Sequence, residues 1–230
     1  MRGMHRLILY FVLLASLCAA TAVAQSGSVS IDNEPHHRRL LYTSDLRLWE
    51  VGLPPGQSTP PFVHEYDIAT VVIGDGTLNI QRNGEALTPP AANARGSVIV
   101  ADHTGAPATY RIENTGTTAY RAFEIENMHD AGKWGAAPPI SALGSSVLNE
   151  SRAFTVYNLA LKPGDQPATH QHTGATIIVL IGGTVEQGGI GGEEPVRIQQ
   201  PGQWLVLPRF QGHTVAAIGA DAHAIEIEVR

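Results

Sequence analysis

Short runs of alternating apolar and polar residues fill most of the chain, separated by turn residues. The segments AFEIEN, residues 122–127, and AIEIEV, residues 224–229, alternate with a period of two, which is the period of a β-strand. The runs TVVI at 70–73 and TIIVLI at 176–181 are rich in β-branched residues, and such runs favour strands. Asn83-Gly84 is a strong hairpin signal. The pattern therefore predicts an all-β protein.

The chain contains an internal repeat. The stretch around Gly56 aligns with the stretch around Gly164 at a constant offset of 108, each followed by a β-branched run and a glycine-rich turn. Each copy ends on a strand that contains the letters EIE. Two copies predict two similar small barrels or sandwiches. We expect a polar N-terminal segment at 25–40, a first barrel at 41–127, a linker at 128–150 and a second barrel at 151–230.

The first 24 residues have the features of a secretory signal peptide. Arg2 and Arg6 precede an apolar stretch, and Ala22-Val23-Ala24 matches a small-residue cleavage site. A retained membrane anchor and a lipoprotein signal at Cys18 are the alternatives. We expect an exported protein, periplasmic or secreted. Cys18 is the single cysteine, so the mature chain would have no disulfide or thiolate ligand.

The charge balance limits the partners. The chain has a formal net charge of −6, and removing Arg2 and Arg6 leaves 13 basic against 21 acidic residues. We therefore expect neither nucleic acid nor, after signal cleavage, a membrane as partner. The basic cluster His36–Arg39 is interpreted as a solvated tail. A small molecule is the expected ligand, and the sequence leaves a homo-oligomer open.

Histidines are concentrated in the second copy. His170 and His172 lie two residues apart, so they point to the same face of an extended strand. His213 follows Pro208 by five residues, and Pro208 follows Gly202 by six. Two imidazoles on one face, with a third available, can bind one metal ion.

This spacing resembles the two signature motifs of the cupin superfamily. In the first motif a glycine, five residues and His-x-His precede a glutamate and a later glycine, matched here by Gly164, His170, His172 and Gly183. The resemblance covers nearly the whole mature chain and implies an exported bicupin of two jelly-roll barrels. The ligands it implies for a divalent metal are His170, His172 and His213.

The second copy also departs from the family pattern. Thr176 stands where the motif has its glutamate ligand, and Phe210 and Ala217 replace a glycine and an asparagine of the second motif. Thr176 is a poor metal ligand and is expected next to the ligands or in the pocket. Three histidines still suffice for one divalent transition metal, with Fe, Zn, Mn, Cu and Ni not distinguished.

The last strand carries two glutamates, Glu226 and Glu228. Either could hydrogen-bond a metal-bound histidine. Their neighbours Ile225, Ile227 and Val229 are apolar, so the alternation predicts that the glutamates face solvent.

The first copy has lost most of the motif. Phe62 replaces the first histidine, Tyr110 falls near the last histidine position, and His64 survives as a weak candidate ligand. His103 lies in a predicted turn and cannot be aligned with the motif without an insertion. We expect the first barrel to be a metal-free structural copy rather than to hold a second metal site built from His64, Glu65, His103 and Tyr110.

Two classes of function follow from this site. The resemblance implies a metal-dependent enzyme of oxygenase, isomerase or lyase type acting on a small organic substrate, for which the sequence identifies no general base. The alternative is a non-catalytic module that binds a small molecule or the metal alone. The missing glutamate and the degenerate first copy both fit this alternative.

Overall fold

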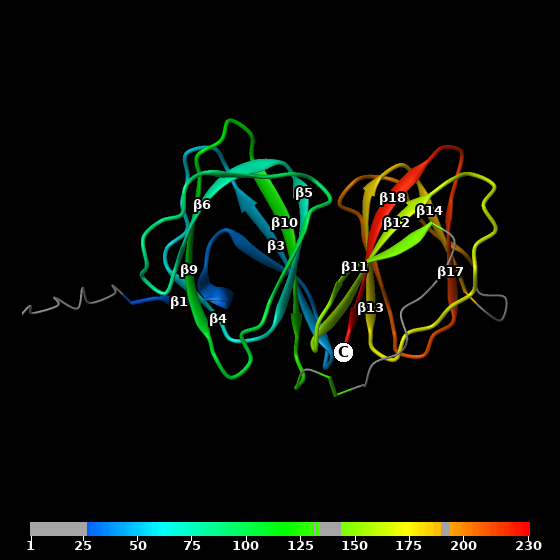
Figure 1. Ribbon diagram of the computed structural model, residues 1–230, viewed down its shortest axis with the longest axis horizontal. Helices are drawn as coiled ribbons and strands as arrows, with labels where there is room; N and C mark the ends of the chain where they lie inside the picture. The colour runs from blue at the N-terminus through cyan, green and yellow to red at the C-terminus, as the bar shows by residue number, and fades with distance from the viewer. Residues whose placement is uncertain (1–26, 131, 134–143, 190–193) are drawn as a thin grey trace, which may run out of the picture.

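A computed structural model describes residues 27–130, 132–133, 144–189 and 194–230. The chain forms two β-barrels that lie side by side (Figure 1), the first from the N-terminal half and the second from the C-terminal half. The described helical structure is one 3₁₀ turn, η1, at Ile31–Asn33. The predicted all-β class is confirmed. The predicted signal peptide lies outside the described residues. No helix within the described ranges is long and apolar enough to cross a membrane.

The first barrel consists of two five-stranded sheets. One sheet has the strand order β1 (Val29–Ser30), β4 (Phe62–His64), β9 (Ala108–Asn114), β6 (Gly76–Arg82) and β7 (Ala91–Asn93). The other has the order β2 (His37–Tyr42), β3 (Leu46–Leu53), β10 (Tyr120–Asn127), β5 (Ile68–Gly74) and β8 (Val98–Ala101). Directly after β6, Asn83 and Gly84 have φ angles of 49° and 74°, which agrees with the predicted turn.

The second barrel repeats this plan with a five-stranded and a three-stranded sheet. The larger has the order β11 (Ser145–Glu150), β12 (Phe154–Leu161), β18 (Ala222–Val229), β13 (Thr176–Gly182) and β16 (Trp204–Leu207). The smaller has the order β15 (Val196–Ile198), β14 (Val185–Gly189) and β17 (His213–Ala217).

Three strands lie where the sequence predicted none, and the first of them is β1 inside the segment expected to be polar and N-terminal. Strand β11 falls inside the segment 128–150 that we expected to be a linker, and it pairs with β12. Strand β2 begins at His37 and pairs with β3, so interpreting His36–Arg39 as a solvated tail was wrong. The side chain of His37 is buried because it lies between two carboxylates of the first barrel.

The two barrels share an apolar core where the β2-β3-β10-β5-β8 sheet of the first faces the five-stranded sheet of the second. Buried residues from both halves belong to one cluster, among them Val71 and Ile125 of the first barrel and Ile177 and Ile227 of the second. Each barrel also has an apolar cluster of its own inside. Strands β10 and β18 are therefore buried on both faces, one towards the partner barrel and one towards their own interior.

Candidate metal centre

The backbone brings the two histidine segments of the second barrel together. His170 and His213 form an isolated antiparallel bridge, with N–O distances of 3.0 and 2.9 Å between the paired backbone groups. The ring centroids of these two histidines lie 4.2 Å apart, and the ring of His172 lies 5.5 Å from that of His213. The three histidines that the sequence predicted as ligands therefore meet at one place.

A fourth side chain completes this cluster. The Nε2 atoms of His172 and His213 each lie 2.9 Å from Oε1 of Glu226, and Nε2 of His170 lies 3.5 Å from it. One candidate ligand atom from each of the four residues lies within 4.8 Å of all the others. Glu226 and His213 are fully buried, and His172 is 3 % exposed.

The position of Glu226 corrects the sequence prediction. We expected Glu226 and Glu228 to face solvent, but both are fully buried. Ile225 and Ile227, their apolar neighbours, face the other barrel rather than the interior of their own. Because a strand alternates its faces, this orientation turns both glutamates into the barrel. The carboxylate missing at Thr176 is thus supplied by β18, the strand that pairs with β13.

The histidine rings are oriented through their Nδ1 atoms. Nδ1 of His170 lies 3.0 Å from the carbonyl oxygen of Ala168, and Nδ1 of His213 lies 3.1 Å from that of Gln211. A carbonyl only accepts, so each Nδ1 carries the proton and donates it. In the neutral ring Nε2 then has a free lone pair directed at the centre of the cluster.

Glu228 supports His172 from the other side. Its Oε2 lies 3.5 Å from Nδ1 of His172. Its Oε1 accepts hydrogen bonds from the backbone N–H and the hydroxyl of Thr173, both at 2.9 Å, and from the N–H of Gly174 at 3.2 Å. A Cβ on Gly174 would lie 1.7 Å from the carbonyl oxygen of Val229, so only glycine fits this approach.

Electrostatics favours a cation at this site. Burial alone would raise the pKa of Glu226, but hydrogen bonds with the three histidines hold it well below its usual range. Burial likewise opposes charge on His172, but hydrogen bonds to Glu226 and Glu228 outweigh it and raise the pKa of His172 to about 9. The site therefore keeps its carboxylate ionised.

The donor set fits a metal ion. Nε2 of a neutral histidine and the oxygens of an ionised carboxylate carry only lone pairs, so a proton or a metal ion must lie between such groups when they face each other at this distance. Oε2 of Glu226 is buried and has no hydrogen-bond partner within the described part of the chain. Three imidazoles and one carboxylate are ligands that divalent transition metals accept. The four residues could therefore hold one such ion.

Thr176, predicted to lie beside the ligands or in the pocket, is the first residue of β13. It is 1 % exposed and pairs in register with Glu228. No hydrogen bond between its side chain and the histidines is recorded among the described residues. A role for Thr176 in the site stays a prediction.

The first barrel has the same framework with different side chains. Phe62 pairs in register with Tyr110, as His170 pairs with His213, so these two residues occupy the positions of the missing histidines. Glu124 and Glu126 of β10 correspond to the glutamates of β18. His64 is buried, as the motif position requires, and its Nε2 lies 3.6 Å from Oε2 of Glu124.

His103 joins this group although the sequence alignment could not place it. Its ring stacks on that of His64 with centroids 5.6 Å apart, and its Nε2 lies 3.4 Å from the hydroxyl of Tyr110. Burial is the main cause that lowers the pKa of His103 to about 4, assisted by the charges of His64 and Arg82. Within the described ranges, the second barrel alone brings three or more possible metal-ligand atoms of His, Asp or Glu close enough together to hold an ion.

Cations of the chain itself neutralise the glutamates of the first barrel. Nε2 of His37 lies 3.1 Å from Oε2 of Glu124, and its Nδ1 is bonded to Glu34. Burial would lower the pKa of His37, but Glu124 and Glu34 raise it to about 9. Nε of Arg47 lies 2.7 Å from Oε2 of Glu126.

Neither a protein-family model nor a curated protein matches the sequence. Solved structures match over most of the chain. The cupin 2 conserved barrel domain protein from Leptotrichia buccalis has a TM-score of 0.57 and 15 % identity, over 84 % of this chain and 88 % of that one. Salicylate 1,2-dioxygenase from Pseudaminobacter salicylatoxidans has a TM-score of 0.64 and 11 % identity, over 85 % and 77 %. A structure of that dioxygenase with gentisate has a TM-score of 0.60 and 11 % identity, over 81 % and 69 %. Identities this low carry the fold and no further property.

Proposed function

Because this chain has the cupin fold, with two barrels in tandem, we propose that its second barrel binds one divalent transition metal through His170, His172, His213 and Glu226. We further propose that the metal acts on a small organic substrate, as in an oxygenase, isomerase or lyase. The proposal includes export of the protein to the periplasm or the medium, which rests on the signal-like sequence of residues 1–24.

One observation carries the metal proposal. Three ring nitrogens surround a single buried carboxylate oxygen at 2.9, 2.9 and 3.5 Å. A buried carboxylate is costly unless a cation compensates it. In the first barrel His37 and Arg47 do this for the equivalent glutamates. In the second barrel the recorded ion-pair partners of Glu226 among the described residues are His170, His172 and His213. Without a metal, protonation of His172 would compensate the carboxylate, and a metal ion bound by the neutral histidines would supply that charge instead.

The number of ligands decides between catalysis and simple binding. Zinc in structural sites is four-coordinate, so three histidines and Glu226 would close its coordination sphere. Iron, manganese and nickel accept six ligands, which would leave two positions for substrate or oxygen. Glu226 as fourth ligand thus favours an enzyme if the native metal is six-coordinate. It favours the non-catalytic binding module if the metal is tetrahedral zinc.

The surroundings of the site suit an organic substrate. Ile178, Leu180 and Leu207 belong to the apolar cluster inside the second barrel, and an apolar interior favours a modest organic molecule over a phosphate. The bound metal would supply Lewis-acid chemistry or a site for oxygen. The chain would supply ring orientation through Ala168 and Gln211 and a proton acceptor for Nδ1 of His172 in Glu228. The oxygenase class is tested first, because oxygen uptake is a direct readout of it.

The test loads tag-free protein separately with Fe(II), Zn(II), Mn(II), Ni(II) and Cu(II). X-ray absorption then gives the coordination number, and an oxygen electrode measures oxygen uptake with gentisate. A six-coordinate ion and oxygen uptake that is lost in His213→Ala are the expected results. If tetrahedral zinc is the single tightly bound ion and no turnover is seen, the enzyme proposal is rejected and the non-catalytic binding module is supported. Failure to bind any of the ions would overturn both.

A further inference from the structure

The first barrel contains a cavity between its two sheets. It encloses ≈ 90 Å³ in which the centre of a water molecule can lie. One buried water needs about 10–15 Å³ by this measure, so the cavity has room for a molecule of several heavy atoms. A purely structural copy would gain stability by filling this space with side chains.

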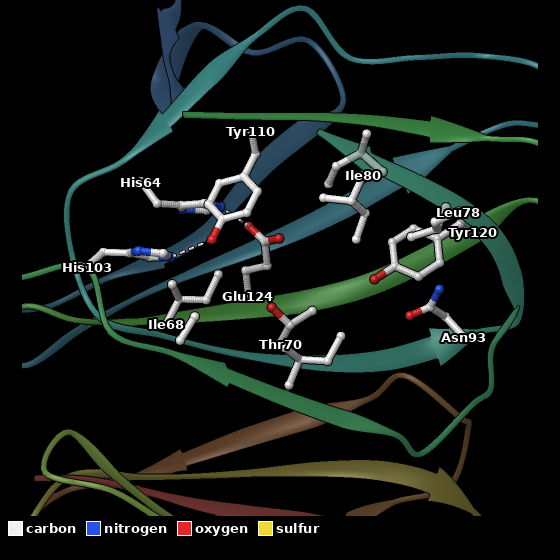
Figure 2. Close-up of a pocket in the computed structure, with 13 residues that line it drawn as sticks. His64, Ile68, Thr70, Leu78, Ile80, Asn93, His103, Tyr110, Tyr120 and Glu124 are labelled. Atoms are coloured by element: carbon white, nitrogen blue, oxygen red, sulfur yellow. Dashed lines mark hydrogen bonds and ion pairs between the residues drawn. The ribbon is translucent and has the colours of Figure 1, made fainter. Parts of the chain in front are cut away.

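Polar groups gather at one end of the cavity. His64, His103, Tyr110 and Glu124 point towards one another there, whereas Leu78 and Ile80 line the space beyond them (Figure 2). His103 is 1 % exposed and His64 is 3 % exposed. Nδ1 of each of these two histidines is buried without a hydrogen-bond partner in the described part of the chain. Nδ1 of His64 lies 4.0 Å from Oε1 of Glu126, which does not line the cavity, so the groups available to a ligand at this end are those of Glu124 and Tyr110.

Glu124 and Tyr110 have hydrogen-bonding capacity to spare. Oε2 of Glu124 takes the hydrogen bond from His37, and no partner for Oε1 is recorded among the described residues. The hydroxyl of Tyr110 lies 3.4 Å from Nε2 of His103, which is longer than a good hydrogen bond. This hydroxyl could turn towards a ligand at little cost.

The charges of this end select against ionic ligands. Neighbouring His64 and His37 hold the pKa of Glu124 below its usual range despite burial, so Glu124 is an anion that would repel a carboxylate. His37 already compensates that charge at 3.1 Å. The attraction between an ammonium group and Glu124 would therefore be too weak to offset the cost of removing that ammonium group from water. A hydroxyl group can donate to Oε1 of Glu124 and accept from Tyr110 without such a penalty.

The remaining walls are mainly apolar. Leu78 and Ile112 contribute aliphatic side chains, and Tyr120 closes the far end. We propose that the first barrel is a metal-free binding site for a small neutral molecule with an apolar body, about the size of one ring, and a hydroxyl group held between Glu124 and Tyr110. This site is separate from the metal cluster and does not depend on it.

Phenol is the probe, and benzene and benzoate are its controls. Titrations are made in the His213→Ala background, so that phenol cannot bind a metal in the second barrel and failure of the metal proposal does not affect the result. Calorimetry measures the affinity for each molecule. A hydrogen bond to a charged group favours phenol over benzene by about tenfold or more, and benzoate is expected not to bind.

Two further variants locate the site. Tyr110→Phe removes one hydroxyl and keeps the ring, so it should weaken phenol several-fold and leave benzene unchanged. Ala101→Phe places a large side chain in the cavity wall and should abolish binding of both molecules. A circular dichroism melt of each variant confirms that it is folded. In the second barrel, Leu207→Phe, at the position that matches Ala101 in strand register, is a control that should bind phenol like the parent.

Phenol that binds tighter than benzene, and loses part of this advantage in Tyr110→Phe, would support the proposal. Three results would overturn it: no saturable phenol binding by the folded parent, equal affinity for phenol and benzene, or phenol binding that survives Ala101→Phe. Preferential binding of benzoate would also overturn it, because it would show that Glu124 does not accept the hydrogen bond.

Discussion

The two barrels share the order of their central strands and a pair of inward glutamates, but two of the motif histidines are present in the second barrel alone. His170 and His213 form a backbone pair in the second barrel, and Phe62 and Tyr110 form the corresponding pair in the first. The glutamates are buried in both barrels.

The comparison shows that a buried carboxylate needs a cation, and that the chain meets this need in two ways. His37 and Arg47 compensate Glu124 and Glu126 in the first barrel. In the second barrel three histidines surround Glu226, and an ion would complete the arrangement. The strand β2, which contributes His37, therefore explains much of why one barrel can do without a metal.

Removal of one predicted ligand should have the largest effect on this contrast. His213→Ala should weaken metal binding by more than about 100-fold, because loss of a ligand exceeds the effect of losing its supporting group. Tyr110→Ala, at the matched position, should leave the affinity unchanged. Competition with a metal-sensitive chelator dye measures both. Equal losses in the two variants would contradict the assignment of the metal to the second barrel.

His37→Gln should remove the internal cation of the first barrel. The folded pKa of His37 is about 9 against an unfolded value near 6.5, so its stabilisation, about 3 kcal/mol at most, is complete below pH 6.5. It is lost as the pH rises from 6.5 through 9. Urea unfolding of metal-loaded protein at pH 6.5 and 9.5 measures the difference between wild type and variant. A difference independent of pH would show that His37 does not stabilise as a cation.

Glu228→Gln should weaken metal binding by about 10–100-fold, because Glu228 supports the ligand His172 through Nδ1. The control is Glu126→Gln, which removes the equivalent carboxylate of the first barrel. We expect no change of metal affinity in the control, measured by the same chelator competition. An unchanged metal affinity in Glu228→Gln would show that the contact between Glu228 and His172 does not contribute to metal binding.

The smallest effect is expected from rebuilding the site in the first barrel. Phe62→His with Tyr110→His would place two histidines beside His64 and Glu124. A second metal equivalent should bind, but weakly, because His37 already compensates Glu124. Adding His37→Gln to this double variant should strengthen the second site. Calorimetric titration with zinc counts the sites, and a single site in both proteins would contradict the comparison.

The sequence predicted the repeat, the strands and the three histidines because these depend on local periodicity and on spacing. It did not predict the inward direction of Glu226 and Glu228, because alternation alone does not tell which face of a strand is the barrel interior. Contact between the barrels buries Ile225 and Ile227 on the opposite face. The signal that could have found these glutamates is the EIE segment shared by both copies, since a solvent-facing pair has no reason to recur.

His37 was missed, and His103 was not favoured as a site residue, for a different reason. Both reach the first-barrel site from outside the motif, His37 through β2 and His103 from the segment between β8 and β9. Their partners, Glu124 and Tyr110, are 87 and 7 residues away in the sequence. Neither pairing follows a strand period, so only the three-dimensional structure brings these residues together.

The central claim is that the second barrel binds one metal and the first binds none. Elemental analysis of tag-free protein tests it most directly, with wild type, Glu226→Gln and Glu124→Gln prepared in parallel. The account predicts about one equivalent of a transition metal in wild type and in Glu124→Gln, and much less in Glu226→Gln. A full equivalent retained by Glu226→Gln but lost from Glu124→Gln, or no metal in wild type after incubation with each ion, would contradict it.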